Sequence, residues 1–187
     1  MLNPRLAGRY AKSLIDLAIE RNELETVYKD ILFLQEVCNN SREFVALMKS
    51  PVIDIDKKEK VFAAVTKGRI SELTASFHHL LIRKGREANF PEIIQAFISQ
   101  YNKYKGIHII KLTTAAPVSE ELKQEIVSKV QSQTSMKKIE LRTEVKEDLI
   151  GGFVLEMGDM LVDASISYDL KAIRKQFLNN DFIYKIR

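Results

Sequence analysis

The spacing of apolar side chains changes at Gly106, and this change limits the folds that are open to the chain. In residues 1–105, apolar residues recur every three or four positions, as they do on one face of an α-helix. After Gly106 a β-branched run occupies 107–112, and charged residues alternate with apolar residues and a threonine over 139–145. A period of two is typical of a half-buried β-strand. The chain therefore divides into a helical part and an α/β part.

Capping residues and helix breakers divide the first part into six predicted helices. Asn3 and Pro4 have the pattern of an N-cap followed by the first helical position. Gly68, Gly85 and Gly106 follow the fourth, fifth and sixth apolar stretches, where glycine can end a helix in a left-handed conformation. Because the connections between these helices are short, neighbouring helices are expected to run antiparallel in a bundle.

The second part alternates strands with helices. The pattern predicts a strand at 107–112, a helix beginning at Ser119, a strand at 139–145, a hairpin of 153–157 and 160–166, and a last helix that includes 170–178. Gly158 and Asp159 suit a two-residue type II′ turn in the hairpin. The predicted fold class is α+β with two domains: an N-terminal six-helix bundle at 1–105 and a small C-terminal α/β domain at 106–187.

Composition indicates a globular chain in a reducing compartment. Of the 187 residues, 45% are hydrophobic and 29% are charged, which is ordinary for a folded globular protein. The longest apolar runs have five residues, as in 44–48, whereas a helix that crosses a bilayer needs about 20. The only cysteine, Cys38, has no partner for an internal disulfide, and the first residues lack the apolar stretch of a secretory signal. We therefore expect a cytoplasmic protein without direct membrane insertion.

The net charge of +4 gives little support for nucleic-acid binding. The excess positive charge belongs to the first 105 residues, but it is scattered, whereas nucleic-acid binding usually needs a basic stripe. Lys57, Lys58 and Lys60 form a short basic run, which Glu59 interrupts and which lacks interleaved aromatic residues. We interpret this run as a solvated helix face.

Motifs for catalysis or cofactor binding are missing from the sequence. The spacings of a serine nucleophile turn and of a phosphate-binding loop do not occur. His78 and His79 are adjacent, so on a helix they point about 100° apart and cannot easily share a metal. One is expected to be half-buried and the other exposed, and Cys38 is expected to be a small core residue. We predict no catalytic residues, no metal site and no cofactor.

Three segments resemble a known family, the delta subunit of the rotary ATP synthase, which is equivalent to the mitochondrial oligomycin-sensitivity-conferring protein. Residues 149–170 resemble its C-terminal signature, although Ala164 stands where the family often has glycine. Residues 9–14 resemble its first helix, and 80–86 resemble its fifth helix and the following turn, with Lys84 where asparagine is more usual. The signature positions are Gly151, Gly152, Gly158, Asp159, Asp163 and Ser165.

The resemblance implies a non-catalytic stator subunit. The helical domain would bind N-terminal segments of alpha subunits on the catalytic head, and the second domain would bind the b subunits of the peripheral stalk. The chain would be a monomer within this hetero-oligomeric complex, peripheral to the cytoplasmic face of a bacterial inner membrane. By resisting torque it would couple proton flow to ATP synthesis.

For the alpha-subunit segment, the expected groove lies between the first and fifth predicted helices. Apolar stripes on these helices are wider than one bundle interior needs, which suits the docking of a partner helix. Each of these residues can equally be ordinary core, because periodicity shows which face is apolar and not which chain covers it. The expected groove residues are Tyr10, Leu14, Phe77, Leu80 and Leu81.

Two other functions stay open at this point. The basic first half and the small α/β domain are compatible with a nucleic-acid adaptor, and an enzyme with an unrecognised site is a third possibility. Salt separates the first two functions, because phosphate binding weakens steeply as the salt concentration rises, whereas an apolar groove tolerates salt. An enzyme would lose turnover when one polar residue is changed.

We predict that residues 1–105 fold without the rest of the chain, since six capped helices with their own apolar faces need no strand from the second part. Expressed alone, this fragment should give a helical circular dichroism spectrum and melt cooperatively. A fragment that aggregates, or melts without cooperativity, would show that the boundary near Gly106 is misplaced.

Overall fold

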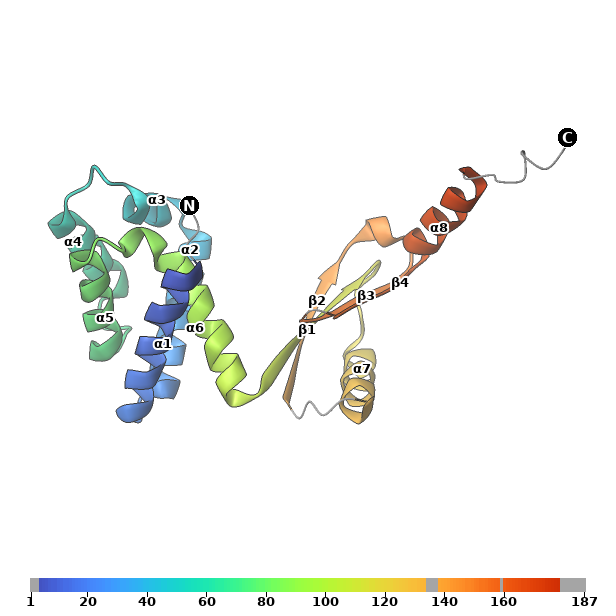
Figure 1. The fold of residues 1–187 in the computed structure, drawn as a ribbon, viewed down its shortest axis with the longest axis horizontal. Coiled ribbons are helices and arrows are strands. Elements are labelled where there is room, and N and C mark those ends of the chain that lie inside the picture. The colour runs from blue at the N-terminus through green and yellow to red at the C-terminus, as the bar shows by residue number, and fades with distance from the viewer. Residues whose placement is uncertain (1–3, 134–137, 159, 179–187) are drawn as a thin grey trace, which may run out of the picture. The chain divides into compact units, whose positions relative to one another are not determined.

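The computed structural model describes residues 4–133, 138–158 and 160–178. Within these ranges the fold is α+β, with eight α-helices and a four-stranded mixed sheet (Figure 1). The chain divides into two compact units at 1–104 and 105–187. The predicted N-cap Asn3 and the turn residue Asp159 lie outside the described residues.

The first unit is built from helices, and α6 supplies much of its interior. Its buried apolar residues recur every three or four positions and so form one broad stripe that faces the interior of the unit: Phe90, Ile93, Ile94, Phe97, Ile98 and Tyr101. The helices are α1 (Pro4–Glu20), α2 (Leu24–Asn40), α3 (Arg42–Lys49), α4 (Ile55–Thr66), α5 (Glu72–Arg83) and α6 (Phe90–Lys105), with a 3₁₀ turn η1 (Glu87–Asn89) before α6.

A buried carboxylate on α2 holds the start of α5. Asp30 accepts hydrogen bonds from the backbone N–H of Ser71 at 2.8 Å, from the Ser71 hydroxyl at 2.6 Å and from the Thr74 hydroxyl at 2.8 Å. Ser71 is the N-cap of α5, and its Oγ also accepts from the Thr74 N–H. The negative charge therefore lies at the positive end of the helix dipole and fixes α5 against α2.

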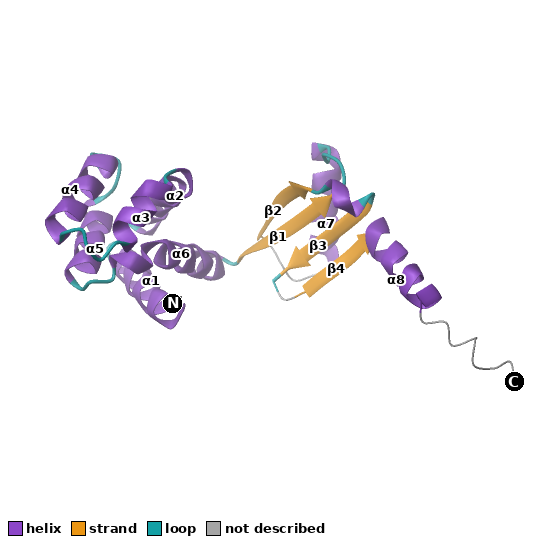
Figure 2. Ribbon diagram, turned by 90° about the horizontal axis from the view of Figure 1, so that it is seen from above, coloured by secondary structure: helices purple, strands orange, loops and turns teal. Residues whose placement is uncertain are grey.

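The second unit is a mixed sheet with the strand order β2-β1-β3-β4. A helix connects the parallel pair β1 and β2, while β3 pairs antiparallel with both β1 and β4. Figure 2 shows α7 against one face of this sheet, where Ile110, Leu112, Val130 and Leu155 form the core. The elements are β1 (Ile107–Thr114), α7 (Glu120–Gln133), β2 (Lys138–Val145), a 3₁₀ turn η2 (Glu147–Leu149), β3 (Gly152–Met157), β4 (Met160–Ser165) and α8 (Ile166–Leu178).

The interpretation of the basic run as a solvated face is wrong for one of its lysines. Lys58 is 2% exposed, and its Nζ donates to the carbonyl of Met48 at 3.2 Å and pairs with Glu87 at 2.7 Å. It lies one helical turn before the buried Phe62, on the inner face of α4. Tertiary contacts thus place this charge inside, where Glu87 neutralises it and joins α4 to η1.

Asp30→Asn should destabilise the first unit by about 1 to 3 kcal/mol, because a neutral amide cannot accept all three hydrogen bonds and loses the interaction with the helix dipole. Urea unfolding of the full chain, followed by helical circular dichroism, measures this change. Asp54→Asn is the matched control, since Asp54 pairs with Lys57 at the surface and should change stability by less than about 0.5 kcal/mol. Equal effects of the two substitutions would contradict the role of Asp30.

Candidate partner-binding surfaces

Half-exposed apolar side chains from α1 and α5 lie together on the first unit. The rings of Tyr10 and Phe77 pack edge to face, with centroids 6.4 Å apart and an interplanar angle of 68°. Leu80 follows one helical turn after Phe77 and is 46% exposed, and Leu17 follows two turns after Tyr10 and is also exposed. We call Tyr10, Leu17, Phe77 and Leu80 the α1–α5 surface.

Two of the five predicted groove residues do not lie on this surface. Leu14 is 1% exposed and Leu81 is 0% exposed, so both belong to the core of the unit. Leu81 lies about 100° around its helix from the exposed Leu80, and Leu14 lies about 60° from the exposed Leu17. The apolar pattern does not show where the core ends and the surface begins. Tyr10, Phe77 and Leu80 stay predicted partner-binding residues, whereas Leu14 and Leu81 are not accessible to a partner in the free chain, and the structure adds the exposed Leu17.

A charged pocket lies at one end of the α1–α5 surface. Leu6, Arg9, Tyr10 and Arg86 line a pocket of about 250 Å³. Both arginines belong to the segments that resemble family motifs, but sequence reasoning did not select them as site residues. For Arg9 the adjacent aromatic residue Tyr10 was a signal that could have found it, because arginine and aromatic residues are both enriched in interfaces. Arg86 joins them only through the fold.

A second unpartnered apolar surface lies on α8. Its apolar residues Ile166, Leu170, Ile173 and Phe177 are spaced by four, three and four positions and all are exposed, Phe177 by 79%. None of the thirteen residues of α8 is buried. This spacing is typical of a helix that packs along another helix. We call these four residues the α8 stripe.

The glycine pair of the signature allows close backbone packing where β3 begins. Gly152 has a φ of +73°, and a Cβ at this position would lie 2.1 Å from the carbonyl oxygen of Ala164. A Cβ on Gly151 would lie 2.6 Å from Cδ1 of Ile166. Gly158, with a φ of +58°, lies in the β3–β4 connection that brings Met157 opposite Met160. These glycines are therefore needed for backbone conformation and close backbone packing, and they do not indicate a ligand site.

The remaining described signature residues position the start of α8. The Asp163 Oδ1 accepts a hydrogen bond from the backbone N–H of Ser165 at 3.0 Å, and hydrogen bonds from Ser165 lower the pKa of Asp163. Ser165 is buried, and its Oγ accepts from the N–H of Tyr168 at 3.2 Å, as a helix N-cap does. These contacts fix the direction in which α8, and with it the α8 stripe, leaves the sheet.

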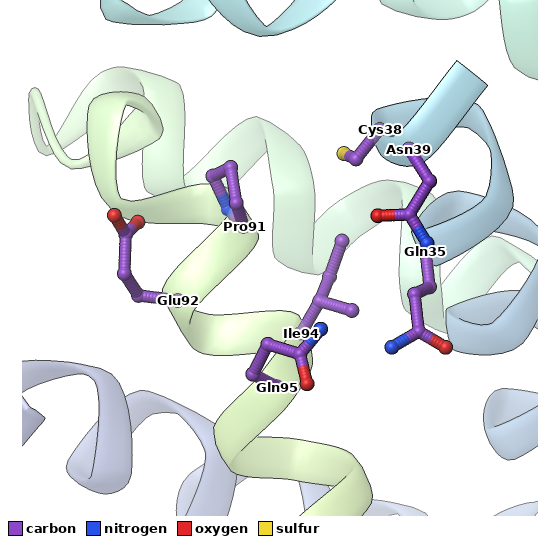
Figure 3. Close-up of a pocket in the computed structure, with 7 residues that line it drawn as sticks. All are labelled: Gln35, Cys38, Asn39, Pro91, Glu92, Ile94 and Gln95. Atoms are coloured by element: carbon purple, nitrogen blue, oxygen red, sulfur yellow. The ribbon is translucent and has the colours of Figure 1, made fainter. Parts of the chain in front are cut away.

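Cys38 is half-buried near the end of α2 and is less enclosed than the small core residue predicted from the sequence. It lines a pocket of about 150 Å³ between the end of α2 and the start of α6, where Figure 3 shows its sulfur pointing from α2 toward α6. Burial raises the pKa of Cys38 to about 11, so the thiol stays protonated at neutral pH. Because the thiolate is the nucleophile, this environment suppresses its reactivity.

The two adjacent histidines have different environments. His78 is buried and stacks on Phe62 with ring centroids 3.3 Å apart, and burial lowers its pKa to about 3. His79 is exposed, and its Nδ1 lies 2.6 Å from Glu59 Oε1. Between pH 6.5 and 3 only the unfolded chain gains a proton at His78, so this residue lowers stability as the pH falls. Among the described residues, no group of three or more His, Cys, Asp or Glu could hold a metal ion.

Gly152→Ala should destabilise the second unit by about 1 to 3 kcal/mol, because the added methyl group meets the Ala164 carbonyl and the positive φ becomes strained. Amide hydrogen exchange of β3 and β4 in the full chain measures the change. Gly158→Ala is a matched control with a similar φ and open space around the added Cβ. Its effect should be smaller, and an equal effect would show that φ alone, and not the close approach, requires glycine at 152.

Comparisons with known proteins agree with the resemblance seen in the sequence. A family model described as ATP synthase delta (OSCP) subunit matches residues 6–177. The ATP synthase subunit delta of Cytophaga hutchinsonii is 37% identical over 177 residues, which cover 95% of this chain and 96% of that protein. The corresponding subunit of Christiangramia forsetii is 31% identical over 186 residues, which span 100% of both chains.

The fold has a counterpart in a solved ATP synthase. A chain in the mitochondrial ATP synthase hexamer of Toxoplasma gondii superposes with a TM-score of 0.72 and 25% identity, covering 92% of this chain and 97% of that one. In the described part of this chain, no helix is long and apolar enough to cross a membrane. The chain belongs to the ATP synthase delta (OSCP) subunit family.

Proposed function

We propose that the two units of this chain bind two different parts of the ATP synthase. Residues 1–105, as a six-helix bundle, bind an N-terminal segment of an alpha subunit on the catalytic head. Residues 106–187, as a small α/β domain, bind the C-terminal ends of the b subunits. The chain itself is a non-catalytic subunit of the stator. These two contacts would resist the torque of the rotor, so that proton flow is coupled to ATP synthesis.

The α1–α5 surface supports the head contact and is the observation that carries the proposal. Tyr10 and Phe77 form its floor, and Leu80 and Leu17 stand exposed beside them. An apolar strip of this kind suits the apolar face of an amphipathic helix. Arg9 and Arg86 line the pocket at its end, where their positive charge would attract an acidic side chain of the bound segment and set its direction.

The α8 stripe supports the stalk contact. The four large apolar side chains of the stripe are all exposed, and no residue of α8 is buried within its own unit. Full burial of one such side chain contributes about 1.5 to 3 kcal/mol. A stalk helix that covers the stripe would therefore gain enough apolar contact to hold the second unit.

The same proposal implies where in the cell the chain is located. The ATP synthase delta subunits of Cytophaga hutchinsonii and Christiangramia forsetii are similar to this chain, and the resemblance to their family implies a bacterial complex on the cytoplasmic face of the inner membrane. We infer that one copy of this chain, as a monomer within the complex, lies on the cytoplasmic side of the inner membrane and reaches the membrane only through its partner subunits.

The nucleic-acid alternative receives no support from the comparisons, which consist of ATP synthase subunits and complexes. The basic run on α4 also offers less exposed charge than its sequence indicates, because Lys58 is buried against Glu87. The enzyme alternative likewise receives no support, because the matched family is that of the ATP synthase delta (OSCP) subunit.

Leu80→Asp should weaken binding of a synthetic alpha N-terminal peptide at least tenfold. The substitution removes an apolar contact and brings a carboxylate against an apolar partner helix, and both effects oppose binding by about 1.5 kcal/mol or more. Because Leu80 is half-exposed in the free chain, the melting temperature should change little. Titration calorimetry and thermal melting of the full chain measure the two quantities.

Leu32→Asp is the matched control for this experiment. Leu32 is an exposed leucine of α2 outside the α1–α5 surface, so the same chemical change there should leave peptide affinity unaltered. A stable Leu80→Asp chain that binds the peptide as well as the parent would remove the α1–α5 surface from the head contact. Equal losses in the two variants would mean that added negative charge, and not the site, weakens binding.

A further inference from the structure

The backbone at Ile150 has a conformation that isoleucine disfavours. Its φ is +64° and its ψ is −34°, outside even the left-handed helical region in which ψ is about +30° to +60°. Among the described residues, the other non-glycine position with a positive φ is Asn22, and asparagine tolerates this conformation. Five glycines occupy positive-φ positions elsewhere in the chain. A β-branched residue at 150 is therefore an exception that needs a reason.

Hydrogen bonds on both sides hold Ile150 in this conformation. Its N–H donates to the carbonyl of Glu147 at 2.9 Å and closes η2. The carbonyl of the next residue, Gly151, accepts from the N–H of Ile166 at 3.1 Å. Because both neighbouring segments are fixed, the backbone cannot relax without breaking these contacts, and the strain is stored in the native state.

Burial within the chain does not explain why isoleucine occupies this position. The Ile150 side chain is 63% exposed and so contributes little to the core of the second unit. A glycine would fit the backbone better and would lose little burial. An exposed apolar side chain on a strained backbone points to a contact outside the chain.

Ile150 continues the α8 stripe beyond the beginning of the helix. The side chain of Ile166, the first stripe residue, lies against Gly151, where a Cβ would come within 2.6 Å of it. The helix α8 also contacts η2, and Figure 1 shows η2 beside its first turn. Ile150, which directly precedes Gly151 in the chain, thus lies at the end of the stripe that Ile166 begins.

The features of this surface indicate an amphipathic helix as its occupant. The spacing of four, three and four along the α8 stripe matches the contacts of two helices packed side by side. α8 carries three basic residues, Lys171, Arg174 and Lys175, and one acidic residue, Asp169. A partner helix whose apolar stripe is flanked by acidic side chains would complement this charge.

We propose that Ile150 is an anchor residue for the stalk helix, kept in a strained conformation so that its side chain extends the α8 stripe. This inference rests on the proposed function, because it takes the b-subunit helix as the occupant of the stripe. The strain lowers the stability of the free chain, and the apolar contact with the bound helix offsets it. Ile150 thus lowers the stability of the free second unit and raises its affinity for the stalk helix.

Ile150→Gly in the full chain tests this proposal, because it relieves the strained φ and at the same time removes the apolar side chain. We expect greater resistance of the second unit to unfolding, measured by hydrogen exchange of β3 and β4. We also expect roughly tenfold weaker binding of the soluble C-terminal part of the b subunits, the loss that follows from removing about one buried side chain. Ile150→Val, which keeps a β-branched apolar side chain and the strain and removes only one methyl group, should change both quantities much less.

A stripe variant separates this inference from the proposed function. Ile173→Asp should abolish stalk binding if the α8 stripe is the contact, whatever Ile150 does. Normal binding by Ile150→Gly together with lost binding by Ile173→Asp would overturn the anchor and leave the proposed function standing. Normal binding by both variants would overturn both proposals, and an Ile150→Gly chain of lower stability would show that the side chain serves the fold.

Discussion

The carboxylate of Asp30 determines where α5 lies in the first unit. Three hydrogen bonds join it to Ser71 and Thr74, 41 to 44 positions away in the sequence. They fix the beginning of α5 on α2, and this places Phe77 and Leu80 where Phe77 meets Tyr10 of α1. The α1–α5 surface thus stands on a helix whose start is held by charge and hydrogen bonds, and a rigid support of this kind suits a recognition site.

A second buried charge serves the neighbouring part of the same unit. Lys58 joins α4 to the end of α3 and to η1 through Met48 and Glu87. Its charge is neutralised within the chain, so both buried ions of this region have partners. The effect of the two interactions is to fix helix positions that apolar packing alone leaves less specific.

In the second unit, backbone geometry, and not a buried charge, fixes the position of a helix. The close approach of Gly152 to Ala164, together with the cap by Ser165, determines where α8 begins. The apolar stripe of α8 is not covered by its own unit. The backbone of Ile150, near the start of the stripe, has a strained conformation. Both features reduce the stability of the free unit, as is expected of a part that completes its contacts in an assembly.

The sequence by itself determined the order of helices and strands, because apolar period, capping residues and glycines act over a few neighbouring positions. The strand pattern at 107–112 and 139–145 corresponds to β1 and β2, and the three glycines predicted to end helices, Gly68, Gly85 and Gly106, all have a positive φ. The motif residues at both ends of the chain also led to the family.

Only the tertiary structure decided which apolar and charged residues face solvent. Leu80 and Leu81 are neighbours with the same side chain, yet one is half-exposed and the other is fully buried. Lys58 lies inside, within a basic run that was interpreted as solvated. Asp30 finds its partners across a long sequence separation. Such outcomes depend on how whole helices pack, and local periodicity carries no record of which distant element covers a given face.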